Sequence, residues 1–328
     1  AQPLYCGRVL VLIKVEVRNL TKQYDSHLAV DNISFSIETG KIYGFLGPNG
    51  AGKSTTMNMI AGCLAPTSGQ VLIAGHDLHE EPKEAKQHIG YLPEMPPLYQ
   101  DMTPKEFLSF VCEIKRIPRA ERADVIADVM QRTGIADVSG RLIRQLSKGY
   151  KQRVGIAQAL VGYPEFIMLD EPTVGLDPLQ IIEIRKLIRE LGEKHTVLLS
   201  SHILSEVSEI CDEVIILSKG QLVARDTTEN LGALPGGSRL FMLVEGDEAD
   251  VRDVLEDVGA SGIVITPAGE DKVEVEAEVE ENAKDKIFYA FAEAKLPIRE
   301  MRTEKMSLEE IFLRYTSAGG GDGHGGGL

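Results

Sequence analysis

A glycine-rich stretch near the N-terminal end constrains the fold of this chain more than any other feature. It comprises Gly47, Pro48, Asn49, Gly50, Ala51, Gly52, Lys53, Ser54 and Thr55. The stretch fits GxxxxGK[ST] and stands between a predicted strand, KIYGFLG, and a predicted helix, KSTTMNMIAGCL. Glycines let successive backbone N–H groups turn toward one anion, and the helix N-terminus adds its positive dipole end. The pattern therefore predicts a phosphate-binding loop, with Lys53 reaching the β- and γ-phosphates of a nucleotide and the Ser54 hydroxyl bound to Mg²⁺.

Short apolar strands alternate with helical segments from residue 14 to about residue 234. The runs FIMLD and TVLLSSH are continuous apolar strands, whereas VEVRNL and ISFSIE alternate with a period of two. Continuous apolar strands interleaved with helices indicate a parallel sheet that is covered on both faces. From about 101 to 163 the pattern is helical only, and Thr103-Pro104-Lys105-Glu106 predicts a capped helix start. We therefore expect an α/β domain over residues 14–234 with an inserted helical subdomain at about 101–163.

The C-terminal part of the chain follows a different pattern. After a linker with glycine and proline, NLGALPGG, residues 238–317 predict the order β-α-β-β-α-β and then a final short helix, SLEEIFLRYT. That order is typical of a small ferredoxin-like α+β domain. The Gly-rich tail at residues 318–328 is expected to be disordered, and residues 1–13 are interpreted as an N-terminal extension.

Two carboxylates directly follow the apolar strand FIML. Asp170 and Glu171 stand at the C-terminal end of that strand, which is where α/β sheets place their ligands. An apolar run followed by DE is common, and it gains meaning here because a phosphate-binding loop precedes it. Asp170 is then predicted to hold Mg²⁺, usually through water, and Glu171 to polarise an attacking water.

A second candidate anion site lies at the start of a later helix. The stretch LSKGYKQ places Ser147 and Gly149 at a predicted helix N-terminus, yet the sequence carries one phosphate-binding loop. The phosphate loop, this LSxGxxQ stretch, the LDE that ends at Glu171 and a later SSH together resemble an ABC-type ATPase subunit. The resemblance covers roughly residues 14–230 and implies a P-loop NTPase core of the ABC type that binds ATP and Mg²⁺.

The resemblance also implies a head-to-tail dimer and assigns roles to further residues. Ser147 and Gly149 of one subunit would face the γ-phosphate that the other subunit binds. Tyr24 would stack on adenine; the alternative is a packed tyrosine at a strand end. Asp177 would connect the two sites across the dimer and could at the same time cap the helix that follows it. His202, at the end of TVLLSSH, resembles the switch histidine that senses the γ-phosphate.

One position departs from the pattern of the family. The usual Gln between the phosphate loop and the helical subdomain is replaced by Glu94, in GYLPEMPPLYQDMT. Glutamate accepts hydrogen bonds but cannot donate them, and it carries charge beside the metal. The exact metal shell therefore stays open at this position, and export-type members of the family often resemble this chain there.

The resemblance is to the exporter branch of the family, which includes multidrug, sodium and gliding-motility-associated transporters. It implies an ATP-hydrolysing subunit of a membrane exporter that works with a separate transmembrane permease. No apolar run approaches the ~18 residues of a membrane-spanning helix, so the partner is expected to supply the membrane path. Four cysteines without a CxxC pair favour a reduced, cytoplasmic setting. The resemblance implies in addition a peripheral position on the cytoplasmic face of the cell membrane. The alternative is a soluble ABC ATPase acting on nucleic acid or ribosomes. The long coiled-coil insertion, zinc-type cysteine pairs or second cassette usual in such proteins are not found in the sequence.

The charge of the chain is unevenly distributed. It has 35 Lys+Arg and 50 Asp+Glu, a formal net charge of −15. Residues 239–316 hold 20 acidic and 10 basic residues, so a net charge of −10 belongs to the C-terminal domain. An acidic balance opposes a general affinity for nucleic acid, which requires a basic surface. We expect the C-terminal domain to face solvent or a basic partner rather than an anionic lipid surface.

Overall fold

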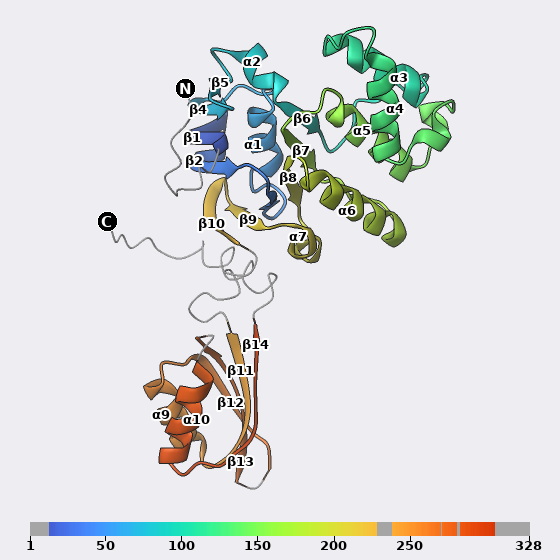
Figure 1. Cartoon of the computed structure of the whole chain (residues 1–328). Helices are drawn as coiled ribbons and strands as arrows, with labels where there is room; N and C mark the ends of the chain where they lie inside the picture. Colours follow the sequence, from blue (N-terminus) through green and yellow to red (C-terminus); the bar gives the residue numbers. More distant parts are fainter. Residues whose placement is uncertain (1–12, 228–237, 270, 281–282, 306–328) are drawn as a thin grey trace, which may run out of the picture. The chain divides into compact units, whose positions relative to one another are not determined.

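The computed structural model describes residues 13–227, 238–269, 271–280 and 283–305. The chain divides into two compact units between Arg225 and Asp226 (Figure 1). The predicted linker, the final short helix and the Gly-rich tail lie outside the described residues, as do residues 1–12 of the predicted extension. In the part that is described, no helix is both long and apolar enough to cross a membrane.

A largely parallel sheet forms the centre of the first unit. Its order within the described residues is β10-β9-β3-β8-β7-β6. The strands are β3 (Ile42–Leu46), β6 (Ile89–Leu92), β7 (Phe166–Asp170), β8 (Thr196–Ser201), β9 (Glu213–Ser218) and β10 (Gln221–Thr227). β3 pairs in parallel with β8 and β9, and β7 pairs in parallel with β6 and β8. Every residue of β3, β7, β8 and β9 is buried, as the continuous apolar runs predict.

Helices that follow these strands pack against the sheet. They are α1 (Lys53–Ile60), α5 (Lys148–Leu160), α6 (Pro178–Gly192) and α7 (Leu204–Ile210). Because β3, β7 and β8 run in the same direction, their carboxyl ends meet at one edge of the sheet. The glycine-rich loop and the chain segments that follow β7 and β8 therefore leave the sheet side by side (Figure 1).

A second sheet of this unit is antiparallel and has the order β2-β1-β4-β5 among the described residues. Its strands are β1 (Ile13–Tyr24), β2 (His27–Glu38), β4 (Ser68–Ile73) and β5 (His76–Asp77), and α2 (Pro82–Gln87) follows β5. Ile33, Phe35 and Ile37 are buried at alternate positions of β2, and the Phe35 ring lies 5.9 Å from the Phe45 ring of β3. The period-two pattern thus marks the face that joins the core of the parallel sheet.

A helical subdomain stands between β6 and β7. It contains α3 (Pro104–Ile114), α4 (Arg122–Arg132), the 3₁₀ turns η1 (Ala136–Val138) and η2 (Ile143–Gln145), and α5. The predicted capping box is confirmed, because Thr103 Oγ1 accepts from Glu106 N at 3.3 Å and Thr103 N donates to Glu106 Oε2 at 2.8 Å. The predicted helix after Ser147 is also found, and Ser147 is its N-cap.

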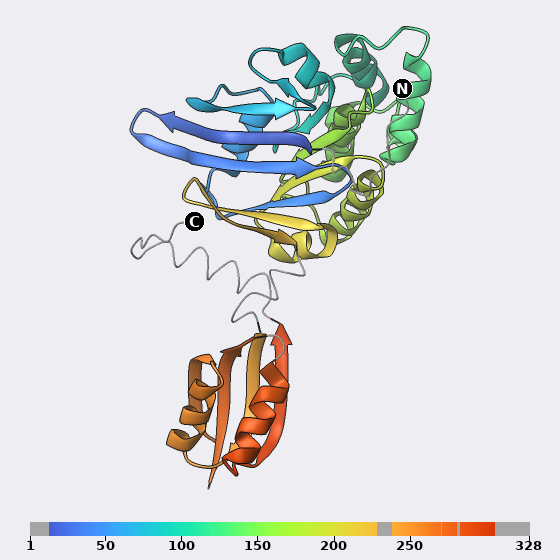
Figure 2. The ribbon, with the colours of Figure 1, turned by 60° about the vertical axis from the view of Figure 1, so that its left-hand side comes forward.

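The second unit has the predicted β-α-β-β-α-β order. Its elements are β11 (Ser238–Glu245), α9 (Glu248–Asp257), β12 (Ser261–Pro267), β13 (Lys272–Val279), α10 (Ala283–Glu293) and β14 (Ile298–Lys305). The four strands described here pair antiparallel in the order β12-β13-β11-β14. Both helices pack on one face of this sheet (Figure 2), where Val251, Leu255, Ile287 and Phe291 join alternate residues of β11 and β13 in one apolar core.

Candidate functional site

The glycine-rich loop connects β3 to α1 and requires glycine for steric reasons. Gly50 and Gly52 have φ angles of 79° and 101°, in the left-handed region that favours glycine. A Cβ atom on Gly52 would lie 2.6 Å from the Ala29 carbonyl oxygen, and one on Gly47 would lie 2.6 Å from the Leu217 carbonyl oxygen. The backbone is therefore closely held on both sides, and its N–H groups lead into the N-terminus of α1.

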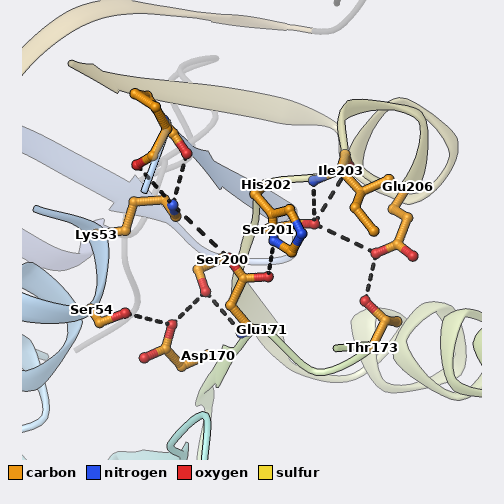
Figure 3. Close-up of polar contacts among 12 residues, drawn as sticks. Lys53, Ser54, Asp170, Glu171, Thr173, Ser200, Ser201, His202, Ile203 and Glu206 are labelled. Atoms are coloured by element: carbon orange, nitrogen blue, oxygen red, sulfur yellow. Dashed lines mark hydrogen bonds and ion pairs between the residues drawn. The ribbon is translucent and has the colours of Figure 1, made fainter. Parts of the chain in front are cut away.

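Lys53 is a buried cation at the start of α1. Its side chain is 6% exposed, and its Nζ donates to the Gly47 carbonyl oxygen at 2.7 Å and lies 3.9 Å from Glu171 Oε1 (Figure 3). Burial lowers the pKa of Lys53, while the nearby carboxylates of Glu171, Asp170 and Glu94 act in the opposite direction. A buried cation held beside a loop of backbone N–H groups can pair with phosphate oxygens.

Asp170 lies at the end of β7 and is 2% exposed. Its Oδ1 accepts hydrogen bonds from Ser200 Oγ at 2.5 Å and from Ser54 Oγ at 3.3 Å (Figure 3). The hydroxyl of Ser54 and the carboxylate of Asp170 are hard oxygen donors, which fit Mg²⁺. The described residues contain no group of three or more His, Cys, Asp or Glu side chains able to hold a metal. Mg²⁺ usually keeps several waters and shares phosphate oxygens, so one or two protein ligands are enough to hold it.

Glu171 and His202 come from neighbouring strand ends and meet at the site. His202 Nδ1 lies 2.8 Å from Glu171 Oε2, and Glu171 N donates to Ser200 Oγ at 2.8 Å. Glu171 has a φ of 48°, which is strained for a residue with a side chain and is common at functional positions. The side chain of Glu171 is 9% exposed and that of His202 is 44% exposed. A carboxylate that accepts protons and an imidazole that contacts it form a pair able to orient a water molecule.

A cavity of about 500 Å³ unites most of the predicted site residues. Its lining comprises Tyr24, His27, Ala29, Asn49, Gly50, Ala51, Gly52, Lys53, Ser54, Thr55, Glu94, Glu171, Val174 and His202. Gly47 and Pro48 belong to the loop but are not among these lining residues. Tyr24 is the last residue of β1 and is 44% exposed, with Lys22 Nζ 5.2 Å from the centre of its ring. The ring thus presents an aromatic surface at the rim of the cavity.

Ser147, Gly149 and Asp177 lie elsewhere in the same unit and close to one another. They cap or begin α5 and α6, with Ser147 Oγ accepting from Tyr150 N and Asp177 Oδ1 from Gln180 N. A Cβ on Gly149 would lie 2.8 Å from the Gln180 side chain, so the start of α5 packs against the start of α6. The predicted capping role of Asp177 is confirmed. None of the three is among the described residues that line the cavity.

Sequence reasoning did not single out two residues that belong to this region. Ser200 is fully buried in β8 and bonds both Asp170 and the backbone N–H of Glu171. His27, the first residue of β2, lies opposite Tyr24 in the strand register and lines the cavity. The SSH stretch was the available signal for Ser200, but a continuous apolar strand does not indicate which of its residues faces a neighbouring strand end.

The loop, the buried lysine and the carboxylates at the next strand end define a P-loop nucleotide-binding protein. The family described as ABC transporter matches residues 30–174. The bacitracin transport ATP-binding protein BcrA of Bacillus licheniformis is 41% identical over 211 residues, covering 64% of this chain and 68% of the relative. The linearmycin resistance ATP-binding protein LnrL of Bacillus subtilis is 31% identical over 304 residues, covering 92% and 98%. The chain belongs to the ABC transporter ATP-binding proteins.

Solved structures of this family resemble the chain over about two thirds of its length. An ATP-binding subunit of an ABC transporter has 30% identity and a TM-score of 0.61, covering 66% of this chain and 91% of that one. A dimeric ATP-binding cassette in a post-hydrolysis state with ADP and Pi has 26% identity and a TM-score of 0.60, covering 65% and 98%. These likenesses confirm the predicted α/β fold of the ABC type.

Proposed function

We propose that this chain hydrolyses ATP as the motor subunit of a membrane exporter and works as a dimer with separate transmembrane subunits. The observation that carries the hydrolytic part is the 2.8 Å contact between His202 Nδ1 and Glu171 Oε2, beside a cavity that also holds Lys53. A proton acceptor, an orienting imidazole and a phosphate-binding cation on three adjacent segments suit attack of water on a terminal phosphate.

In this proposal the side chains of the cavity have separate roles in ATP binding and hydrolysis. Lys53 pairs with the β- and γ-phosphate oxygens, and the Tyr24 ring stacks on adenine. Glu171 accepts the proton of the attacking water, and His202 holds the Glu171 carboxylate and contacts the γ-phosphate. Mg²⁺ bound by Ser54, and by Asp170 through water, would neutralise charge on the phosphate oxygens.

Glu94 gives this cavity an additional negative charge where the family usually has Gln. Its carboxylate lines the cavity and is one of the three carboxylates that act against the lowering of the Lys53 pKa by burial. We propose that Glu94 would lie beside a Mg²⁺ ion held by Ser54 and Asp170 and would act there only as a hydrogen-bond acceptor, because a carboxylate cannot donate.

A second copy of the chain completes the site in this proposal. Ser147 and Gly149 begin a helix of thirteen residues whose N-terminus attracts anions, yet they are not among the residues that line the cavity of their own subunit. In a two-fold dimer, residues of one subunit can meet the phosphate loop of the other and the reverse. Asp177 lies beside the start of that helix and would link the two sites. The likeness to a cassette solved as a dimer supports this arrangement.

The membrane partner and the direction of transport rest on relatives. BcrA is named for bacitracin transport and LnrL for linearmycin resistance. By analogy, the chain would be peripheral on the cytoplasmic face of the cell membrane, bound to a transmembrane permease that exports its substrate. The acidic net charge favours a protein partner over nucleic acid.

Affinity capture from detergent-solubilised membranes tests this function. The full chain carries a tag, a chain with the tag and Lys53→Ala serves as a nucleotide-site control, and captured proteins are identified by mass spectrometry. We expect both chains to recover a protein with several membrane-spanning helices, since docking does not require the phosphate site. Recovery of ribosomes or nucleic acid without a membrane protein would contradict the exporter assignment and favour the soluble alternative.

A further inference from the structure

A buried carboxylate that is not among the lining residues of the cavity contacts the neighbours of Glu171 and His202 in the chain. Glu206 belongs to α7, and its side chain is 3% exposed. Its Oε2 accepts a hydrogen bond from Thr173 Oγ1 at 2.6 Å and lies 3.5 Å from Ser201 Oγ (Figure 3). Burying a carboxylate is costly unless it is paired and hydrogen-bonded. Because Glu206 does not line the cavity, contacts within the protein must compensate for the cost of its burial.

Arg185 of α6 supplies the opposite charge. Its Nη2 lies 3.5 Å from Glu206 Oε1, and its Nη1 donates to Glu209 Oε2 at 2.8 Å. The Arg185 side chain is 17% exposed, so solvent screens this ion pair only in part. The pair fixes the Glu206 carboxylate between α6 and α7 and leaves Oε2 for the two hydroxyl groups.

The two hydroxyl groups belong to the segments that carry the proposed reaction. Thr173 follows Glu171 by two residues, and Ser201 directly precedes His202. Ser201 Oγ also accepts from Ile203 N at 3.0 Å, which fixes the turn that contains His202. Glu206 therefore contacts the segment after β7 and the last residue of β8, which adjoin Glu171 and His202, the pair that lies 2.8 Å apart.

Glu171 needs such support because its backbone is strained. A φ of 48° persists in a glutamate only where the surroundings hold it. Ser200 Oγ holds the Glu171 N–H from one side, and the Thr173 bond to Glu206 holds the chain two residues further on. We propose that Glu206, kept in place by Arg185, is a positioning residue that fixes the geometry of Glu171 and His202 for hydrolysis. This inference rests on the proposed function, in which that pair acts on the attacking water.

Thr173→Val tests the inference, because it removes the hydroxyl at nearly constant volume. Thr173→Ser keeps a hydroxyl and serves as the conservative variant. Thr133→Val is the matched control, because Thr133 is also buried and bonds the Val129 carbonyl oxygen at 2.8 Å within the helical subdomain. We expect Thr173→Val to lower kcat on the order of tenfold with ATP affinity unchanged, Thr173→Ser to restore most of kcat, and Thr133→Val to leave kcat unchanged.

Several results would overturn the inference. One is a wild-type kcat in Thr173→Val; others are an equal loss of kcat and ATP affinity, or a loss that Thr173→Ser shares. Glu206→Gln is the second variant if Thr173→Val does not fold; it removes the charge opposite Arg185, and its expected kcat is also reduced at constant ATP affinity. Glu171→Gln, assayed in parallel, separates the two proposals. If it keeps near wild-type turnover, the proposed function fails; if it abolishes turnover while Thr173→Val does not lower kcat, only the positioning role fails.

Discussion

The two units of the chain differ in where their charged side chains lie: several are buried in the first unit, and none of those described in the second unit is buried. The first unit buries Lys53, Asp170, Glu171 and Glu206 close to the carboxyl ends of its parallel strands. In the second unit, Ser238 is the single buried polar residue among those described, and the core is apolar. The glutamates of β13 instead alternate with buried residues and lie on the face of the sheet away from the helices.

This difference indicates where the chemistry is located. Burying charge costs free energy, so a cluster of buried charges persists where a ligand or a reaction requires it. The first unit is accordingly organised around a charged site at one sheet edge. The second unit is organised for packing, and its acidity belongs to its surface. The net charge of −10 over residues 239–316 therefore has no part in the core of that unit.

The largest expected effect comes from inactivating the two halves of the proposed composite site in separate variants. Lys53→Ala removes the phosphate cation, and Ser147→Arg places a bulky cation at the start of α5. Each variant alone is expected to lose turnover on the order of a thousandfold, with Ser147→Arg retaining ATP affinity in the monomer. Mixing the two should restore up to about a quarter of wild-type turnover, because half of the dimers are mixed and each mixed dimer has one intact site.

Steady-state ATPase assays of each variant and of the mixture check this prediction. The control is a mixture of Lys53→Ala and Glu171→Gln. Both residues belong to the half-site that contains the phosphate loop, so each site of a mixed dimer carries one of the two changes and no intact site can form. If the mixture of Ser147→Arg and Lys53→Ala is as inactive as each variant alone, Ser147 does not belong to the site of the partner subunit.

Most of the fold could be predicted from the sequence because its patterns are local. The continuous apolar runs of β3, β7 and β8, the alternation in β2 and the capping box at Thr103 each follow from neighbouring residues. The β-α-β-β-α-β order of the second unit was predicted in the same way. The strand order of the sheets depends on contacts between distant segments, so the sequence patterns did not provide it.

The residues of the candidate site could be predicted where they belong to a sequence motif. They could not be predicted where only the packing of distant segments brings them to the site. Lys53, Ser54, Asp170 and Glu171 stand in recognisable stretches, and the structure brings them together. Thr173 and Glu206 are 33 positions apart and meet only because α7 folds back toward the end of β7. A glutamate in an amphipathic segment is usually solvated, so its burial could not be inferred from its neighbours.

The independence of the second core gives the next prediction. Phe291 of α10 is fully buried among residues of its own unit, and Phe291→Ala should destabilise that unit by about 3 kcal/mol through lost burial and a cavity. Phe288→Ala, on the same helix and 53% exposed, is the control and should change stability by less than about 0.5 kcal/mol. Denaturant unfolding with and without ATP identifies the unit that melts. A loss of ATP-dependent stabilisation in Phe291→Ala would show that the two cores are coupled.

The smallest effect is expected on the charged face of the second unit. Arg239 Nη1 lies 3.3 Å from Glu276 Oε1, and the two side chains are 39% and 45% exposed. Exposed ion pairs contribute little, so Glu276→Gln should lower the free energy of unfolding by less than about 1 kcal/mol and leave ATP turnover unchanged. Because 1 M salt shortens the Debye length to about 3 Å, the difference from wild type should vanish there. Glu274→Gln is the control, since Glu274 has no ion pair in the described part of the chain. A loss of turnover in Glu276→Gln would contradict this prediction and show that this face influences the ATP site, because an exposed ion pair contributes too little to stability to change hydrolysis by itself.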